Sequence, residues 1–185
     1  AEIKKGKNVS TKAGKVLSFE RQEALYQAVR GNYFDVAKYL IDNKADVNMV
    51  DRSNFSLLYH AATNENHALM KLLLEKGADV NLGNCPLCAS CDKKDFEGFK
   101  LIVDKKPKIN QEEWGRILLS AVASKETHLI SLLFERFNVD PNSQVVYCRN
   151  TYPDRYSLLE TAIDYGPLET ADLLIEKGAS FLDEK

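Results

Sequence analysis

The sequence lacks several features that would place it in a particular functional class. No run approaches the roughly 18 apolar residues that a membrane-spanning helix needs. Neither sign of charge dominates, because 25 Lys and Arg face 27 Asp and Glu, giving a formal net charge of -2 among 185 residues. Such a balance gives no general attraction to nucleic acid or to an anionic membrane surface. The composition is that of an ordinary soluble domain with a sizeable core.

Signatures of catalysis are also missing. The chain has no phosphate-binding glycine loop, no G-x-S-x-G and no H-E-x-x-H, and its three histidines are His60, His67 and His128. His60 and His67 are expected on two different helices, with no carboxylate at a spacing typical of a triad. We therefore expect no enzyme activity, no catalytic residue, no cofactor and no metal.

Cysteine is scarce, yet three of the four cysteines fall in one short stretch, "NCPLCASC", at Cys85, Cys88 and Cys91. A metal site needs a fourth ligand, and Asp95 stands where the fourth cysteine of an iron–sulfur motif is expected. A Cys85 to Cys88 disulfide is a second interpretation, and it would be redox-labile because so short a loop removes little entropy from the unfolded chain. Packed free thiols are the favoured interpretation, since cysteine often serves as a small buried hydrophobe.

The sequence repeats itself instead. A leucine expected inside a short helix recurs at spacings of 33, 29, 31 and 41, and an apolar or small residue of a second helix follows each leucine after twelve residues. Periods of this length indicate stacked repeats, whose apolar faces are buried between neighbours. The leucines are Leu25, Leu58, Leu87, Leu118 and Leu159, and the second-helix residues are Ala37, Met70, Phe99, Ile130 and Ala171.

The segments "EKGADVN" at 75–81, "DNKADVN" at 42–48 and "IEKGAS" at 175–180 carry a resemblance to the ankyrin-repeat family over about residues 18–182. The resemblance implies an all-α solenoid of stacked helix–turn–helix units with β-turn finger loops. Gly77 and Gly178 then stand where a left-handed helix cap is needed. The expected organisation is a single domain over 18–185, with repeats at about 18–50, 51–82, 83–110, 111–142 and 143–185.

The resemblance also implies a binding module, since the family recognises proteins through finger tips and the first helices. Transferred to this sequence, those positions give candidate partner-binding residues in several repeats. Aromatic residues at finger positions are either partner anchors or packing between adjacent fingers, and both interpretations stay open for Phe55 and Trp114. The candidates are Arg52, Phe55, Trp114 and Tyr165.

The fifth finger, 143–156, is extended. Fifteen residues separate Asn142 from Ser157, whereas eight separate Asn48 from Ser56, so about seven residues are inserted. The insert contains residue types that are enriched at binding hot spots, and this is the strongest functional signal in the sequence. Alternatively, Val145, Val146 and Tyr147 fold back and cap the stack. The candidate binding residues of the insert are Tyr147, Arg149, Tyr152 and Arg155, with Cys148 as a separate thiol.

Residues 1–17 are rich in lysine and are expected to form a flexible arm. The chain begins at Ala1, which suits either a trimmed chain or the end left after removal of a secretory signal. The leading hypothesis is a monomeric protein that binds and inhibits or sequesters a partner protein, such as an exported bacterial enzyme inhibitor or self-protection protein. The alternatives are an intracellular adaptor or host-directed bacterial effector scaffold, and a thiol redox or metal-binding protein that uses the three clustered cysteines. The expected location is outside the cytoplasm or in the periplasm after removal of a signal peptide, and otherwise the cytoplasm.

Overall fold

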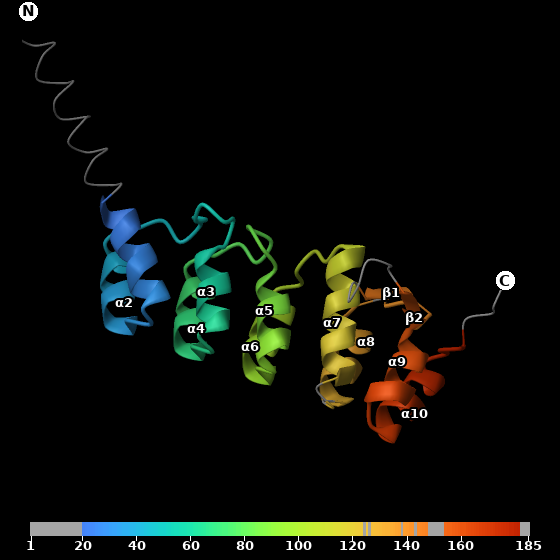
Figure 1. Cartoon of the computed structure of the whole chain (residues 1–185). Coiled ribbons are helices and arrows are strands. Elements are labelled where there is room, and N and C mark those ends of the chain that lie inside the picture. The colour runs from blue at the N-terminus through green and yellow to red at the C-terminus, as the bar shows by residue number, and fades with distance from the viewer. Residues whose placement is uncertain are drawn as a thin grey trace, which may run out of the picture. The chain divides into compact units, whose positions relative to one another are not determined.

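The computed structural model describes residues 20–123, 125, 127–137, 139–142, 144–147 and 154–181. The chain forms two compact units that divide between Pro86 and Leu87, and each unit is described by itself (Figure 1). The predicted lysine-rich arm, 1–17, lies outside the described residues. A single domain over 18–185 stays a prediction. Within the described residues, no helix is long and apolar enough to cross a membrane.

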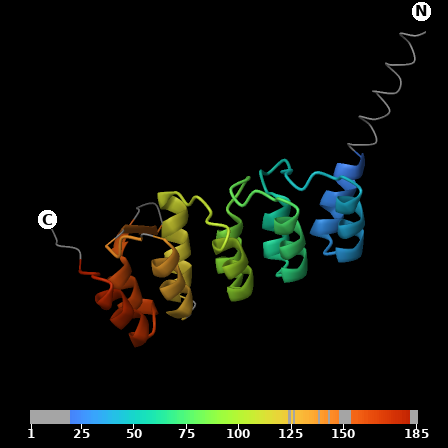
Figure 2. The same ribbon diagram turned by 180° about the vertical axis from the view of Figure 1, so that it is seen from behind.

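The described part of the first unit contains two helix pairs. Residues 20–30 are helical and are followed by α2 (Phe34–Asp42), and α3 (Leu57–Thr63) is followed by α4 (His67–Glu75). The helices of the second pair pack against each other, and α2 contacts α4 (Figures 1 and 2). The marker leucines Leu25 and Leu58 are almost fully buried, as are Leu69 and Leu73 of α4. Each pair therefore buries the apolar positions that define the sequence repeat.

The second unit contains three more helix pairs and a hairpin. The pairs are α5 (Pro86–Lys93) with α6 (Phe96–Val103), α7 (Gln111–Ala123) with α8 (Thr127–Arg136), and α9 (Leu158–Tyr165) with α10 (Leu168–Glu176). The antiparallel strands β1 (Gln144–Tyr147) and β2 (Asp154–Ser157) precede α9, and β1 contacts α7. The predicted all-α repeat fold is thus confirmed, with this hairpin as an addition.

Serine begins the first helix in two of the repeats. The Ser56 hydroxyl accepts a hydrogen bond from the Tyr59 backbone N–H at 3.2 Å, which satisfies a donor that the first turn of a helix leaves unpaired. Ser157 does the same for Glu160 at 3.1 Å, and the Glu160 carboxylate accepts from the Ser157 N–H at 2.7 Å. This reciprocal pair is a capping box, so the boundary of α9 is encoded locally.

Asparagine side chains link consecutive repeats at the loops that follow the second helices. Asn48 donates to the Gly77 carbonyl at 3.0 Å and accepts from the Asp79 N–H at 2.7 Å. Asn142 makes the equivalent bonds, to the Gly178 carbonyl at 3.1 Å and from the Ser180 N–H at 2.8 Å. Asn48 of the segment "ADVN" and Asn142 of the segment "VDPN" therefore each hold the loop of the next repeat.

Both glycines adopt the left-handed backbone that the sequence predicts for them. The φ angles are 88° at Gly77 and 93° at Gly178, where a side chain would be strained. This turn ends the second helix and presents the glycine carbonyl to the preceding repeat's asparagine.

The fourth repeat departs from the expected pattern. Its first helix, α7, begins seven residues before the marker Leu118, whereas α3 begins one residue before Leu58. Asn110 and Glu113 form a reciprocal cap, with Glu113 N–H to Asn110 Oδ1 and Asn110 N–H to Glu113 Oε2 both at 2.9 Å. The finger expected at the start of 111–142 is therefore helix. The prediction that Trp114 occupies a finger position is wrong.

The hairpin register agrees with the insertion counted in the sequence. In the second repeat, Val50 pairs with Ser56 across the finger. In the fifth repeat, Gln144 pairs with Ser157, the residue equivalent to Ser56. The partners are six residues apart in the first case (56 − 50) and thirteen in the second (157 − 144), so seven residues are added inside the fifth finger.

Replacing Asn48 by alanine tests the link between repeats. The change removes two hydrogen bonds to the next repeat, so we expect the free energy of unfolding to fall by about 1–2 kcal/mol in urea titrations. Asn43→Ala is the matched control, because the Asn43 side chain donates to the Tyr39 carbonyl of its own repeat at 2.8 Å and not to the next repeat among the described residues. Equal losses for the two variants would contradict a linking role for Asn48.

Candidate partner-binding surface

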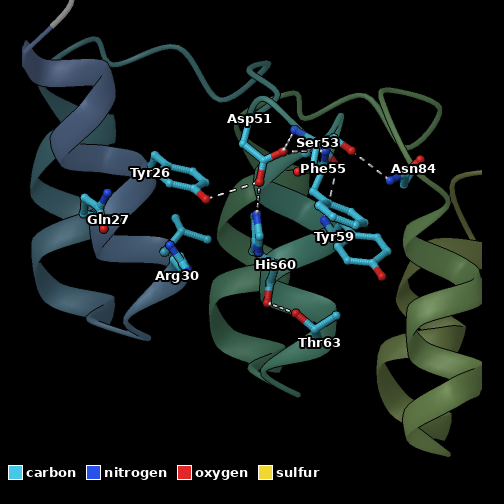
Figure 3. A network of polar contacts seen from close by, with 12 residues as sticks. Tyr26, Gln27, Arg30, Asp51, Ser53, Phe55, Tyr59, His60, Thr63 and Asn84 are labelled. Carbon is cyan, nitrogen blue, oxygen red and sulfur yellow. Dashed lines mark hydrogen bonds and ion pairs between the residues drawn. The ribbon is translucent and has the colours of Figure 1, made fainter.

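A group of polar and aromatic side chains gathers where the second-repeat finger meets the first helices (Figure 3). We call Tyr26, Asp51, Phe55, Tyr59 and His60 the second-repeat cluster. Tyr26 comes from the helical residues 20–30, Asp51 and Phe55 from the finger, and Tyr59 and His60 from α3. The cluster thus joins two consecutive repeats within the first unit.

Asp51 organises the finger itself. Its Oδ1 accepts hydrogen bonds from the backbone N–H groups of Ser53 at 2.8 Å and Phe55 at 3.0 Å. The Asp51 N–H donates to the Phe55 carbonyl at 3.0 Å. Aspartate favours such turns because its short side chain reaches the backbone two residues ahead. The segment "VDRSNFS" at 50–56 therefore closes on the carboxylate.

The second carboxylate oxygen of Asp51 faces the helices. It accepts from the Tyr26 hydroxyl at 3.2 Å and lies 3.1 Å from His60 Nε2. The side chains of Asp51 and His60 are each 15% exposed. Figure 3 shows the carboxylate between the Tyr26 hydroxyl and the His60 ring. One side chain thus ties the finger to both neighbouring first helices.

These contacts shift two pKa values. Burial opposes ionisation of Asp51, but the bonds from the Phe55 N–H, His60, the Ser53 N–H and Tyr26 outweigh it and hold the pKa of the carboxyl below its ordinary value. Burial, followed by the hydrogen bond and charge of Asp51, raises the pKa of the Tyr26 hydroxyl. Asp51 is therefore a fixed anion at neutral pH.

The rings of the cluster pack around that anion. Phe55 stacks on Tyr59 with ring centroids 4.4 Å apart, and the His60 ring meets Tyr26 edge to face at 5.4 Å. The four rings are half-buried, so part of each stays accessible. Two exposed cations, Arg30 and Arg52, lie on the same helix and finger as the cluster. The surface offers both aromatic area and positive charge.

Residues of the following loop brace the finger tip. The Asn84 N–H donates to the Asn54 carbonyl at 2.7 Å, and the Asn84 side chain donates to the Ser53 carbonyl at 3.2 Å (Figure 3). Gly83 has φ 71°, and a Cβ there would lie 2.4 Å from the Asn54 carbonyl oxygen. Glycine is required at this point because of that close approach.

Several predicted site residues have defined places. Arg52 is exposed on the finger, and Tyr165 is 64% exposed at the end of α9. Phe55 packs on Tyr59 of its own repeat, and Trp114 packs edge to face on Phe137 at 5.2 Å. Phe55 and Trp114 are both half-buried, so part of each side chain stays exposed to solvent despite these contacts.

The fifth-finger candidates are only partly described. The backbones of Tyr147 and Arg155 belong to β1 and β2. Cys148, Arg149 and Tyr152 lie outside the described residues. The binding role of this group stays a prediction.

The clustered cysteines belong to the helical architecture. Cys88 and Cys91 of α5 are 1% and 2% exposed, and Cys85, just before the helix, is half-buried. Among the described residues, no disulfide joins these three cysteines to one another. The described part of the chain contains no group of three or more His, Cys, Asp or Glu that could hold a metal ion.

Sequence reasoning missed the contacts of Asp51, Tyr26 and His60. The sequence analysis assigns no role to Asp51 and expects His60 on a helix without a carboxylate partner at triad spacing. The sequence does contain a signal for the turn. Asp51 stands two residues before Ser53, in a segment that ends at the N-cap serine Ser56. No local pattern brings Tyr26 to the same carboxylate, because the two residues belong to different repeats.

The fold and the linked finger loops define a helix–turn–helix repeat protein. A family model described as ankyrin repeats (3 copies) matches residues 3–84. Residues 3–84 therefore match the ankyrin-repeat family, whose repeats generally act as protein–protein interaction modules.

Curated relatives are similar over parts of their length. A putative ankyrin repeat protein of Rickettsia felis is 32% identical over 101 residues, which cover 51% of this chain and 33% of the relative. The human transient receptor potential cation channel subfamily A member 1 is 27% identical over 165 residues, covering 84% of this chain and 14% of the channel. Human mitochondrial disaggregase is 38% identical over 64 residues, which cover 35% of this chain and 9% of the disaggregase. The chain therefore spans a third or less of these relatives.

Replacing Asp51 by asparagine should destabilise the first unit in a pH-dependent way. Because the folded-state pKa is below the ordinary value, the stabilisation is present above about pH 4 and is lost as pH falls through the folded pKa. At pH 7 we expect Asp51→Asn to lower the free energy of unfolding by about 1–3 kcal/mol. The difference from wild type should shrink on acidification to pH 3, as followed by urea unfolding with circular dichroism.

Asp172→Asn is the control, since Asp172 is exposed on α10, and its effect should stay within about 0.5 kcal/mol. A difference between wild type and Asp51→Asn that does not change with pH would show that the carboxylate's charge contributes nothing.

Proposed function

We propose that this chain is a non-enzymatic module that binds one partner protein through the second-repeat cluster and the fifth-repeat hairpin. The observation that carries the proposal is the half-buried aromatic cluster held in place by Asp51. Aromatic and arginine side chains dominate binding energy at protein interfaces, particularly when they are rigid before binding. Four polar contacts on Asp51 supply that rigidity.

The charge near the cluster favours an acidic feature on the partner. Asp51 is already surrounded by donors, whereas the exposed Arg30 and Arg52 are positioned to meet carboxylates. Arginine presents a planar fork of donors that matches a carboxylate. The proposed contact is therefore an apolar group on the rings with an acidic side chain beside it.

The hairpin supplies the second contact. The pairing of Tyr147 with Asp154 brings the two ends of segment 148–153 together, and that segment carries Arg149 and Tyr152. The contact of β1 with α7 anchors the hairpin base on a helix. A binding loop held at its base loses less entropy on association than a free one. Inhibition or sequestration of the partner follows if this hairpin enters a functional cleft, whereas an adaptor would leave the partner active.

A capture experiment with matched variants tests the proposal. The full chain is immobilised and used to retain proteins from its native source, and any retained partner is then purified and its affinity measured by calorimetry. Arg30→Ala with Arg52→Ala should weaken binding about tenfold or more, because hot-spot arginines typically contribute that much. The variant with Tyr147, Arg149, Tyr152 and Arg155 changed to alanine should weaken it similarly.

The matched control is Lys38→Ala with Lys71→Ala, two exposed cations on the second helices α2 and α4. Circular dichroism checks that every variant is folded. If the control weakens binding as much as the arginine variant, general electrostatic attraction explains the capture and the proposed surface is wrong.

A further inference from the structure

His60 has one ring nitrogen that the second-repeat cluster uses and one that it leaves over. Nε2 lies 3.1 Å from the Asp51 carboxylate. Nδ1 makes no hydrogen bond among the described residues. Nor is Nδ1 one of the buried side-chain nitrogen and oxygen atoms that lack a hydrogen bond, so water reaches it. His60 therefore keeps one polar atom that a bound molecule can contact.

Asp51 decides which nitrogen of His60 carries the proton. An ionised carboxylate can only accept hydrogen bonds, so the Nε2 atom beside it must carry a hydrogen. In the neutral ring, Nδ1 then holds a lone pair and acts only as an acceptor. The Tyr26 hydroxyl donates to the same carboxylate oxygen at 3.2 Å and leaves Nδ1 unused. The network thus fixes Nδ1 as a hydrogen-bond acceptor that solvent reaches.

Asp51 itself is already saturated. Its Oδ1 accepts from the Ser53 and Phe55 N–H groups. Its Oδ2 accepts from Tyr26 and His60. Four hydrogen bonds are about the capacity of a carboxylate. A donor on a bound molecule is therefore met by His60 and not by Asp51.

Three aromatic rings surround the His60 ring and hold its orientation. The His60 centroid is 5.4 Å from that of Tyr26, 5.9 Å from that of Phe55 and 6.1 Å from that of Tyr59, each in an edge-to-face arrangement. Figure 3 shows His60 between Tyr26 on one side and Phe55 and Tyr59 on the other. The acceptor is thus set within an aromatic surface.

A partner that covers these rings also removes water from Nδ1. A buried acceptor that loses its water and gains no donor weakens binding about tenfold or more. A purely apolar side chain is therefore disfavoured at this place, and a side chain that carries a donor is favoured. Tyrosine and tryptophan combine an apolar ring with an O–H or N–H donor, which matches both the rings and the acceptor.

We propose that Nδ1 of His60 receives a hydrogen bond from a tyrosine or tryptophan side chain of the partner, whose ring lies on the aromatic residues of the second-repeat cluster. This inference rests on the proposed function for its site and adds the residue type that the partner presents there. His60 thereby determines specificity, because an aromatic ring without a donor, such as that of phenylalanine, leaves the acceptor unpaired.

Two small molecules test the donor without knowledge of the partner. p-Cresol has the ring and hydroxyl of tyrosine, and in its methyl ether the same hydroxyl is methylated. Each is titrated into the isotope-labelled full chain at about pH 8, where imidazole is ordinarily neutral, and followed by NMR. We expect p-cresol to shift the ring resonances of His60 and to bind at least about fivefold more tightly than its methyl ether. Equal affinities, or no shift at His60, overturn the inference.

The ring nitrogen resonances of His60 test the proton position directly. We expect the Nε2–H tautomer in the free chain, because Asp51 accepts from that nitrogen. Binding of p-cresol should shift the Nδ1 resonance more than the Nε2 resonance, since Nδ1 is the atom that gains a donor. The Nδ1–H tautomer in the free chain would contradict the inference.

Three variants separate the acceptor from the network around it. His60→Leu removes the acceptor and should abolish the preference for p-cresol over its methyl ether. His60→Gln keeps both a donor for Asp51 and an acceptor, so it should retain part of the preference. Tyr26→Phe is the matched control, because it removes a donor to the same Asp51 oxygen and leaves Nδ1 in place. Circular dichroism checks that each variant is folded, and a loss in Tyr26→Phe as large as in His60→Leu overturns the inference.

The same variants distinguish this inference from the proposed function. If a partner retained in the capture experiment binds His60→Leu as well as wild type, but is lost with Arg30→Ala and Arg52→Ala, the inference fails and the proposed function stands. If the chain prefers p-cresol through His60 while no captured partner depends on Arg30 and Arg52, the proposed function fails and the acceptor role of His60 stands.

Discussion

Burial of apolar side chains between neighbouring helix pairs is the constraint on which the structure depends. A pair such as α3 and α4 has a face that its own two helices cannot cover, so its stability comes from the adjacent pair. The linking asparagines, the ion pairs between Asp42 and Lys76 and between Asp104 and Arg136, and the capped helix starts all serve this arrangement.

The repeat pattern was sufficient to predict the helix pairs and the glycine turns, because periodic apolar positions and the "EKGADVN" segment act locally. The helical start of the fourth repeat was missed, although Asn110 and Glu113 have the spacing of a capping box. The expectation of a finger loop at this position came from the other repeats, and it was applied although the Asn110–Glu113 spacing indicated a helix start. The strand pairing of the fifth finger was likewise beyond the repeat template, since the inserted residues have no equivalent in it.

The candidate site was harder to predict for a physical reason. Asp51 and His60 are nine residues apart, and Tyr26 comes from the preceding repeat, so their meeting depends on how the finger turns back on the helices. The predicted finger positions gave Arg52 and Phe55 as candidates but not Asp51, the carboxylate that organises the finger. Features that depend on packing between repeats are absent from any single repeat's sequence.

The central claim is that the second-repeat cluster and the fifth-repeat hairpin bind a partner protein. Hydrogen exchange measured by mass spectrometry, on the full chain alone and with its purified partner, tests this claim most directly. The account predicts that partner binding slows exchange in segment 51–60 and in the fifth finger at 144–157, while the outward residues of α2 and α4 are unchanged. Protection confined to α2 and α4, with segment 51–60 exchanging as in the free chain, would contradict it.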